Sequence, residues 1–261
     1  MRHETVANWS KSALINTDTR FYILTRYNLR WPGFYEEESE FQAWSKQRLK
    51  LFQEVCVPGV KSQMVLPHAW YVLFDETFKE REEDLHKMVG LDIFRPIFTP
   101  RNLKSGKAMQ WFIEHNLKSD MRDAEYVVGA RLDNDDTISR YFISFLDDCL
   151  AYARTIKPAP LAFNFPYQFA IIDRRAHVYV ATDSSTTALW ERAAGARTPY
   201  AAMHTKMWEK FDVIECATTI PMVAMHLHDN NAGRLGRDNL IAVDNGEQVA
   251  AKFFAFDFPP R

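Results

Sequence analysis

Three aspartates within four residues are the strongest chemical signal in this sequence. Asp133, Asp135 and Asp136 directly follow a mostly apolar segment that predicts a buried strand over residues 125–132. Carboxylates this close repel one another unless solvent or a cation neutralises them. Their oxygens are the hard ligands that suit Mg²⁺ or Mn²⁺. We therefore predict a divalent-metal site, although an acidic helix N-terminus would have the same composition.

Three known metal-binding motifs share part of this sequence pattern. An EF-hand needs Gly at its sixth position and Glu at its twelfth, where this chain has Ile138 and Ser144. The D-x-D-x-T motif of haloacid-dehalogenase-type phosphatases fits Asp133, Asp135 and Thr137, but it belongs after the first strand of its fold. Here about 130 residues precede it. The D-x-D element of nucleotide-sugar glycosyltransferases ends a strand partway through the chain, so position favours this third motif.

A histidine pair follows Pro221-Met222 and supplies a further candidate ligand. His226 and His228 share one face if the segment is a strand. A metallo-β-lactamase motif counted from His226 fails, because Asn230 and Asn231 replace its Asp and His. We predict that His228 is a further ligand of the metal held by the Asp cluster, with an ordinary polar role as the alternative.

Other common catalytic motifs are missing from the sequence. It contains no G-x-S-x-G, no Walker A, no G-x-G-x-x-G and no C-x-x-C. A serine hydrolase, a P-loop NTPase, a Rossmann dehydrogenase and a zinc ribbon are therefore excluded.

Predicted strands and helices, which must position these residues, alternate through the first part of the chain. Such alternation predicts an α/β fold: a mostly parallel, Rossmann-like sheet flanked by helices, with ligands at the carboxyl ends of the strands. The predicted strands cover residues 20–27, 69–74, 91–98 and 125–132, and the helices 40–55, 77–88, 104–117 and 136–153.

The second part, after Pro158-Ala159-Pro160, is mixed and smaller. Residues 163–172 and 177–181 predict an antiparallel hairpin, and residues 187–194 a helix. We expect a single domain over 1–261, in which 1–157 binds the nucleotide and 158–261 binds sugar and acceptor. Aromatic side chains such as Trp190 are expected at the acceptor.

Composition narrows the possible partners. The 261 residues carry 32 Lys and Arg against 34 Asp and Glu, which argues against a nucleic-acid binder. No uncharged apolar stretch is long enough for a transmembrane segment. Three scattered cysteines predict no disulfide framework, so we expect a cytoplasmic protein, or one attached peripherally to the inner face of the membrane.

The chain resembles bacterial rhamnosyltransferases, which are single-domain, GT-A-like enzymes. The resemblance spans nearly the whole chain, with the Asp cluster and the late histidine as its most specific part. It departs from the family at Val223 and Met225. The matching segments are Arg26-Tyr27-Asn28-Leu29-Arg30, Val72-Leu73-Phe74-Asp75, Arg131-Leu132-Asp133-Asn134-Asp135-Asp136, Leu189-Trp190-Glu191-Arg192, His204-Thr205-Lys206, and Pro221-Met222 leading to His228 and Asn231.

The resemblance implies a glycosyltransferase that moves a rhamnose-like sugar from a UDP, dTDP or GDP donor to a hydroxyl of a glycan or glycolipid, as in polysaccharide biosynthesis. Mn²⁺ or Mg²⁺ would be held by Asp133, Asp135, Asp136 and His228. The donor would be bound by residues of the matched segments together with a nearby lysine: Arg26, Asn28, Asp75, Lys107, Arg131, Asp133 and His204.

An inverting transfer also needs a carboxylate to deprotonate the acceptor hydroxyl. Glu191 is the first candidate because it lies in a matched segment, and Asp173 is the second. Two other functions stay open at this point. A phosphatase would form a phospho-Asp133 intermediate, and a non-catalytic carbohydrate-binding protein would use the aromatic residues without needing the acidic cluster.

Overall fold

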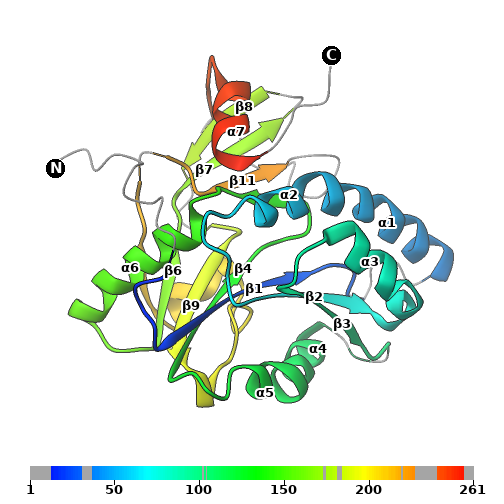
Figure 1. The fold of residues 1–261 in the computed structure, drawn as a ribbon. Helices are drawn as coiled ribbons and strands as arrows, with labels where there is room; N and C mark the ends of the chain where they lie inside the picture. The colour runs from blue at the N-terminus through cyan, green and yellow to red at the C-terminus, as the bar shows by residue number, and fades with distance from the viewer. Residues whose placement is uncertain are drawn as a thin grey trace.

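The computed structural model describes residues 13–30, 37–101, 103, 105–172, 175–180, 184–218, 220–226 and 240–255. These residues form a large sheet covered by helices on both faces, and a smaller sheet beside it (Figure 1). No helix of the described ranges is long and apolar enough to cross a membrane.

The large sheet has seven strands in the order β10-β6-β9-β4-β1-β2-β3. All pairings are parallel except the two made by β9, which runs against its neighbours. The predicted α/β class, with a mostly parallel sheet flanked by helices, is confirmed. The strands are β1 (Thr19–Arg26), β2 (Ala69–Asp75), β3 (Phe94–Thr99), β4 (Tyr126–Arg131), β6 (Leu161–Asn164), β9 (Thr187–Arg192) and β10 (Asp212–Glu215).

Alternating side chains of these strands enter two separate cores. Phe21 and Ile23 of β1 face the first core, whereas Tyr22 and Leu24 face the second. Burial on both faces explains why the central strands are nearly continuous apolar runs. The first core is covered by α1 (Glu38–Leu51), its continuation Phe52–Cys56, α2 (Val57–Lys61), α3 (Glu82–Val89) and α6 (Phe142–Ile156) (Figure 1). The second core is covered by α4 (Ser105–Phe112), its continuation Ile113–Leu117, and α5 (Lys118–Asp120).

The smaller sheet is mixed, as predicted for the C-terminal part, and has the order β12-β8-β7-β11-β5. The predicted hairpin is confirmed as the antiparallel pair β7–β8. Three connections from the carboxyl ends of large-sheet strands, β4 to β5, β6 to β7 and β10 to β11, lead into it, so it borders that edge. Its elements are β5 (Asp136–Ile138), β7 (Tyr167–Ile172), β8 (Arg175–Val180), β11 (Val223–His226), β12 (Leu240–Ala242) and the covering helix α7 (Gly246–Phe254).

The predicted helix over 187–194 is wrong, because Thr187–Arg192 forms β9. Ala, Leu and Glu favour a helix locally, but Leu189 packs on one face of the sheet and Trp190 on the other. Pairing with β4 and β6 overrides the local propensity, and both partners are distant in sequence.

Two element boundaries also differ from the prediction. The strand expected over 163–172 is divided at Pro166 into β6 and β7, which join different sheets. The helix expected from residue 136 begins at Phe142, because residues 136–138 pair with β11 as β5. Since β6, β9 and β10 complete the large sheet, the predicted halves 1–157 and 158–261 share one sheet, and their separate roles stay a prediction.

Candidate active site

Two arginines stand at neighbouring strand ends on the carboxyl edge of the large sheet. Arg26 ends β1 and Arg131 ends β4, and the parallel register places Leu24 beside Arg131. Side chains alternate along a strand, so Arg26 points to the same face of the sheet as Leu24, which is the face covered by α4. The fold thus brings together two cations that are 105 residues apart in sequence.

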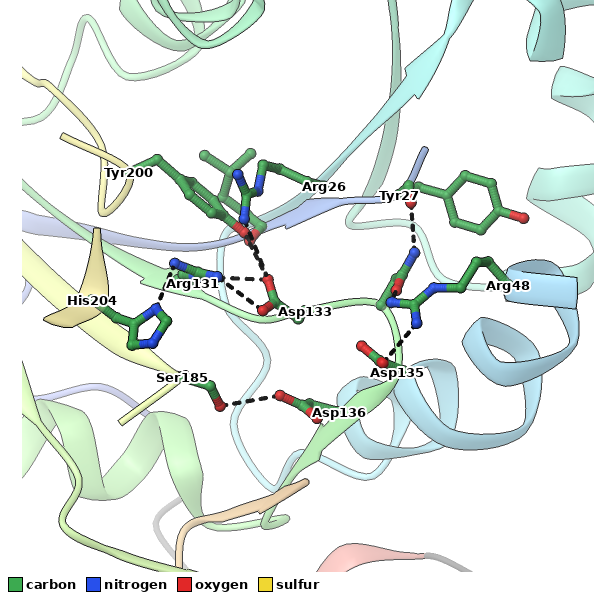
Figure 2. A network of polar contacts seen from close by, with 12 residues as sticks. Arg26, Tyr27, Arg48, Arg131, Asp133, Asp135, Asp136, Ser185, Tyr200 and His204 are labelled. Carbon is green, nitrogen blue, oxygen red and sulfur yellow. Dashed lines mark hydrogen bonds and ion pairs between the residues drawn. The ribbon is translucent and has the colours of Figure 1, made fainter. Parts of the chain in front are cut away.

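Asp133 is held between these arginines (Figure 2). Its Oδ2 accepts a hydrogen bond of 2.9 Å from Arg131 Nη2, its Oδ1 lies 4.0 Å from Arg26 Nη2, and the Tyr200 hydroxyl donates to Oδ1 at 3.4 Å. Burial would raise the pKa of Asp133, but Arg131 and then Arg26 outweigh it and lower the pKa to about 2. Asp133 is therefore ionised and fixes both guanidinium groups.

Tyr200 and His204 complete this cluster from the second half of the chain. The Tyr200 ring lies against both guanidinium groups, 4.3 Å from Arg26 and 4.8 Å from Arg131, in cation–π geometry. His204 Nδ1 lies 3.3 Å from Arg131 Nη1, at the start of a 3₁₀ helix that runs over His204–Glu209. The predicted donor residues Arg26, Arg131, Asp133 and His204 are thus brought together.

The cluster borders a cleft of about 750 Å³. Arg26, Arg131, His204, Lys206 and Lys210 line it, and no carboxylate is among its described lining residues. Gly106 and Met109 of α4 also line it. A concave surface with this charge suits an anionic ligand.

Asp135 has a different partner, which the sequence did not indicate. Arg48 of α1 donates from Nη1 to Asp135 Oδ2 at 2.7 Å and from Nη2 to the side-chain oxygen of Asn134. Both charged side chains are largely buried, with 14% of Arg48 and 8% of Asp135 exposed. Asn134 donates in turn to the Tyr27 carbonyl at 2.6 Å, so this pair anchors the loop after β4 to β1 and α1.

Asp136 is buried and makes no ion pair with the described residues. Its Oδ2 accepts a hydrogen bond of 3.1 Å from the Ser185 hydroxyl. Burial, followed by repulsion from Asp135 and Asp133, raises the pKa of Asp136 well above its usual range. Figure 2 shows the three aspartates turned toward three different partners.

Of the four predicted metal ligands, the structure describes Asp133, Asp135 and Asp136. Among the described residues, no three His, Cys, Asp or Glu side chains lie close enough together to hold an ion. His228, the fourth predicted ligand, lies outside the described residues. Asp136 nevertheless fits a hard cation, because a buried carboxylate without an ion pair is stabilised by one.

Three other predicted donor residues lie elsewhere at this edge. Asn28 is buried and accepts the backbone N–H of Asp75 at 2.8 Å, which ties the end of β1 to the end of β2. Asp75 accepts hydrogen bonds from the Thr77 backbone and from Arg30, at 3.1 Å each. Lys107 is exposed on α4, next to the cleft wall at Gly106.

The structure does not bring Glu191 to this edge. Glu191 pairs with Val127 near the start of β4, whereas the cleft lies at the end of that strand. It is buried, and its Oε1 accepts the backbone N–H groups of Arg197 and Thr198 at 2.7 and 3.0 Å. Burial raises its pKa, and these hydrogen bonds oppose the rise. The second candidate base, Asp173, lies outside the described residues.

Trp190 is likewise a core residue rather than an exposed sugar platform. It is 4% exposed, and its ring packs 5.3 Å from that of Tyr126. The acceptor role expected for Trp190 is therefore wrong, because strand β9 turns this ring into the core under α6.

The chain is similar to several solved structures, with little sequence identity to any of them. 4-Diphosphocytidyl-2C-methyl-D-erythritol synthase from Anaerococcus prevotii aligns with a TM-score of 0.39 and 7% identity, over 76% of this chain and 89% of that one. A "putative nucleotide-diphospho-sugar transferase" from Desulfovibrio desulfuricans G20 aligns with a TM-score of 0.38 and 11% identity, over 76% and 79%. Residues 1–349 of S. aureus TarS align with a TM-score of 0.37 and 14% identity, over 67% and 47%. No curated protein matches the sequence. The family model described as "Putative rhamnosyl transferase" matches residues 33–238, so the chain belongs to this family and is a glycosyltransferase.

Proposed function

We propose that the basic cleft binds the diphosphate of a nucleoside-diphosphate sugar, and that the enzyme transfers a rhamnose-like sugar from it with inversion. The observation that carries this proposal is the convergence of Arg26, Arg131, Lys206 and Lys210 with His204 on one cleft at the carboxyl edge. Ligands of parallel sheets bind at this edge. The proposal adds a diphosphate site, a donor sugar and a stereochemical outcome to the glycosyltransferase activity of the family.

The arginines are suited to a leaving diphosphate because they are already held in place. Guanidinium groups bind phosphate oxygens in a fixed, bidentate geometry. Asp133 and the Tyr200 ring restrain both of them, so less side-chain freedom is lost on binding. When the sugar–phosphate bond breaks, negative charge grows on the diphosphate, and groups fixed beforehand stabilise it most effectively.

A divalent cation is part of the proposal. Asp136 would hold Mn²⁺ or Mg²⁺, with His228 as a further predicted ligand, while Arg131 and Arg48 already neutralise Asp133 and Asp135. When bound, the ion supplies Lewis-acid stabilisation of the diphosphate. Asp135 keeps the loop after β4 in the position that allows Asp136 to face inward.

Family membership sets aside the two alternative functions, a phosphatase and a non-catalytic carbohydrate-binding protein. Both oxygens of Asp133 are engaged by Arg131, as expected of a charged anchor rather than a phosphate acceptor. The donor base, the glycan or glycolipid acceptor, the cytoplasmic location and attachment to the inner membrane face stay predictions.

Calorimetry with UDP, GDP and dTDP, with and without Mn²⁺, tests the proposal. We expect at least one nucleotide to bind, and we expect Arg26→Met and Lys210→Met each to weaken that binding. A lost hydrogen bond to a charged group costs about 1.5–3 kcal/mol, or roughly 10–150-fold in Kd. Lys87→Met, an exposed substitution on α3, is the matched control. Unchanged affinity in both cleft variants would contradict the assignment of the cleft.

A further inference from the structure

A row of polar residues crosses four strands at the carboxyl edge of the large sheet. The strand register places Glu215 beside Asn164, and Asn164 beside Thr187. Ala188 pairs with Ala130, so Thr187 stands next to Arg131. The row thus leads from the arginine of the proposed diphosphate site, across β9 and β6, to a carboxylate on β10.

All members of this row project from the same face of the sheet. Val213, Ala162 and Leu189 pack in one core cluster with Met207, which lies on the cleft-lining segment. Because side chains alternate along a strand, residues two positions away share that face. The residues two positions from these three are Glu215, Asn164 and Thr187.

Glu215 is exposed and held in place. Asn164, which is buried, donates from Nδ2 to Glu215 Oε2 at 2.8 Å. The Asn164 Oδ1 accepts the Ser184 backbone N–H at 2.9 Å, which fixes the orientation of the amide. The carboxylate therefore reaches solvent from a restrained position.

Between Arg131 and Asn164, the row contains a polar group with no partner in the described part of the chain. The Thr187 side chain is 3% exposed, and its hydroxyl makes no hydrogen bond there. A buried hydroxyl without a partner costs free energy. A polar ligand that reached this position would supply the missing partner.

The length of the row suits a sugar held between a phosphate and a carboxylate that accepts a proton. Strands β4 and β10 are three strand spacings apart, or about 14 Å. A phosphate held at Arg131, a sugar ring and an incoming hydroxyl are expected to fill a distance of this order. Glu191 lies on the same face, but it is four residues along β9 from Thr187, about 13 Å from the row. Its Oε1 accepts two backbone N–H groups, and its Oε2 accepts the Arg197 side chain.

We propose that Glu215 is the general base of the transfer, which rests on the proposed donor site. Its carboxylate accepts the proton of the acceptor hydroxyl while that oxygen bonds to the anomeric carbon. The bond between this carbon and the diphosphate oxygen breaks, and its electron pair leaves with the nucleoside diphosphate. Glu215 then returns its proton to water. Asn164 is a positioning residue, because it acts through Glu215.

Other carboxylates at this edge are less suited to the task. Asp133 and Asp135 are paired with arginines, and Asp136 is buried. Among the described residues on the β9 side of Arg131, Glu215 is the exposed carboxylate at the carboxyl edge. It therefore has the access to solvent and acceptor that the base requires.

The test compares Glu215→Gln with Glu209→Gln, an exposed control on the neighbouring 3₁₀ helix. Nucleoside-diphosphate release is measured from L-rhamnose linked to UDP, GDP or dTDP, with water and with octyl glycosides as acceptors. We expect Glu215→Gln to lose about 10²–10⁴-fold in turnover, the scale of general-base catalysis, with nucleotide Kd within about twofold. Glu215→Asp should retain more activity than Glu215→Gln, and Glu209→Gln should match the wild type.

The outcomes separate the two proposals. Wild-type turnover in Glu215→Gln, with a folded protein and normal nucleotide binding, would overturn the base assignment and leave the donor site intact. Loss of nucleotide affinity in step with turnover would also overturn it, because Glu215 would then act in donor binding. A wild-type chain that neither binds nor turns over any of these nucleotides would contradict the proposed function itself.

Discussion

Arg48 is predicted to be a main stabiliser of the loop that carries the aspartates. Its guanidinium group binds Asp135 at 2.7 Å and the side chain of Asn134, and both charges are largely buried. Arg48→Met keeps the apolar length of the side chain but removes the charge. Asp135 then remains buried beside the Asp136 carboxylate, which already lacks an ion pair with the described residues.

The expected loss is large because one charge of a buried pair is left without compensation. Such changes cost about 3–5 kcal/mol. At roughly 2–4 °C per kcal/mol for a chain near this size, the thermal midpoint should fall by about 6–20 °C. Exposed ion pairs differ, since they contribute about 0–1 kcal/mol. Arg122→Met, which removes an exposed pair with Asp123, is therefore the control.

Urea unfolding of the single and double variants measures this effect. Arg48→Met combined with Asp135→Asn removes both charges, so it should recover much of the stability lost in Arg48→Met alone. A loss below about 1 kcal/mol in Arg48→Met would refute the reasoning. An additive double variant would refute it as well, because the two side chains would then not be coupled.

Three further predictions address other buried carboxylates and a histidine. Glu191→Gln should retain activity and stability, because its amide oxygen can still accept the Arg197 and Thr198 N–H groups, whereas Glu191→Ala should lose about 2–4 kcal/mol in urea unfolding; loss of activity in a stable Glu191→Gln protein would contradict this. Burial, and then Arg20, lowers the pKa of His68 below 6.5. The unfolded chain therefore takes up the proton first, and the free energy of unfolding should fall as the pH drops below 6.5. His68→Gln should reduce this pH dependence of unfolding, and an unchanged dependence would count against the assignment. Asp136→Asn should raise the thermal midpoint without metal and abolish the Mn²⁺-dependent rise, and an equal Mn²⁺ response in both proteins would argue against Asp136 as a ligand.

The central strands could be predicted from the sequence because their signals are local. Residues 69–74 and 126–130 are apolar without interruption, and helices of clear periodicity separate them. Strand β9 could not be predicted in this way. Its composition favours a helix, and only pairing with β4 and β6 makes it a strand.

The candidate site shows the same division between local and long-range information. The Asp cluster is contiguous, and its position after a buried strand was enough to find it. Its partners Arg48, Tyr200 and Ser185 come from three distant segments, and no spacing rule connects them with the cluster. The proposed base Glu215 has no comparable signal in the sequence, because it lies on a short, half-exposed edge strand without periodicity.

A crystal structure of the protein with the tightest-binding nucleoside diphosphate and Mn²⁺ tests the central claim most directly. We predict that the diphosphate oxygens lie within hydrogen-bond distance of Arg26 and Arg131, in the cleft that Lys206 lines. A nucleotide bound away from this cleft, for example in the smaller pocket lined by Arg20 and Arg95, would contradict the account.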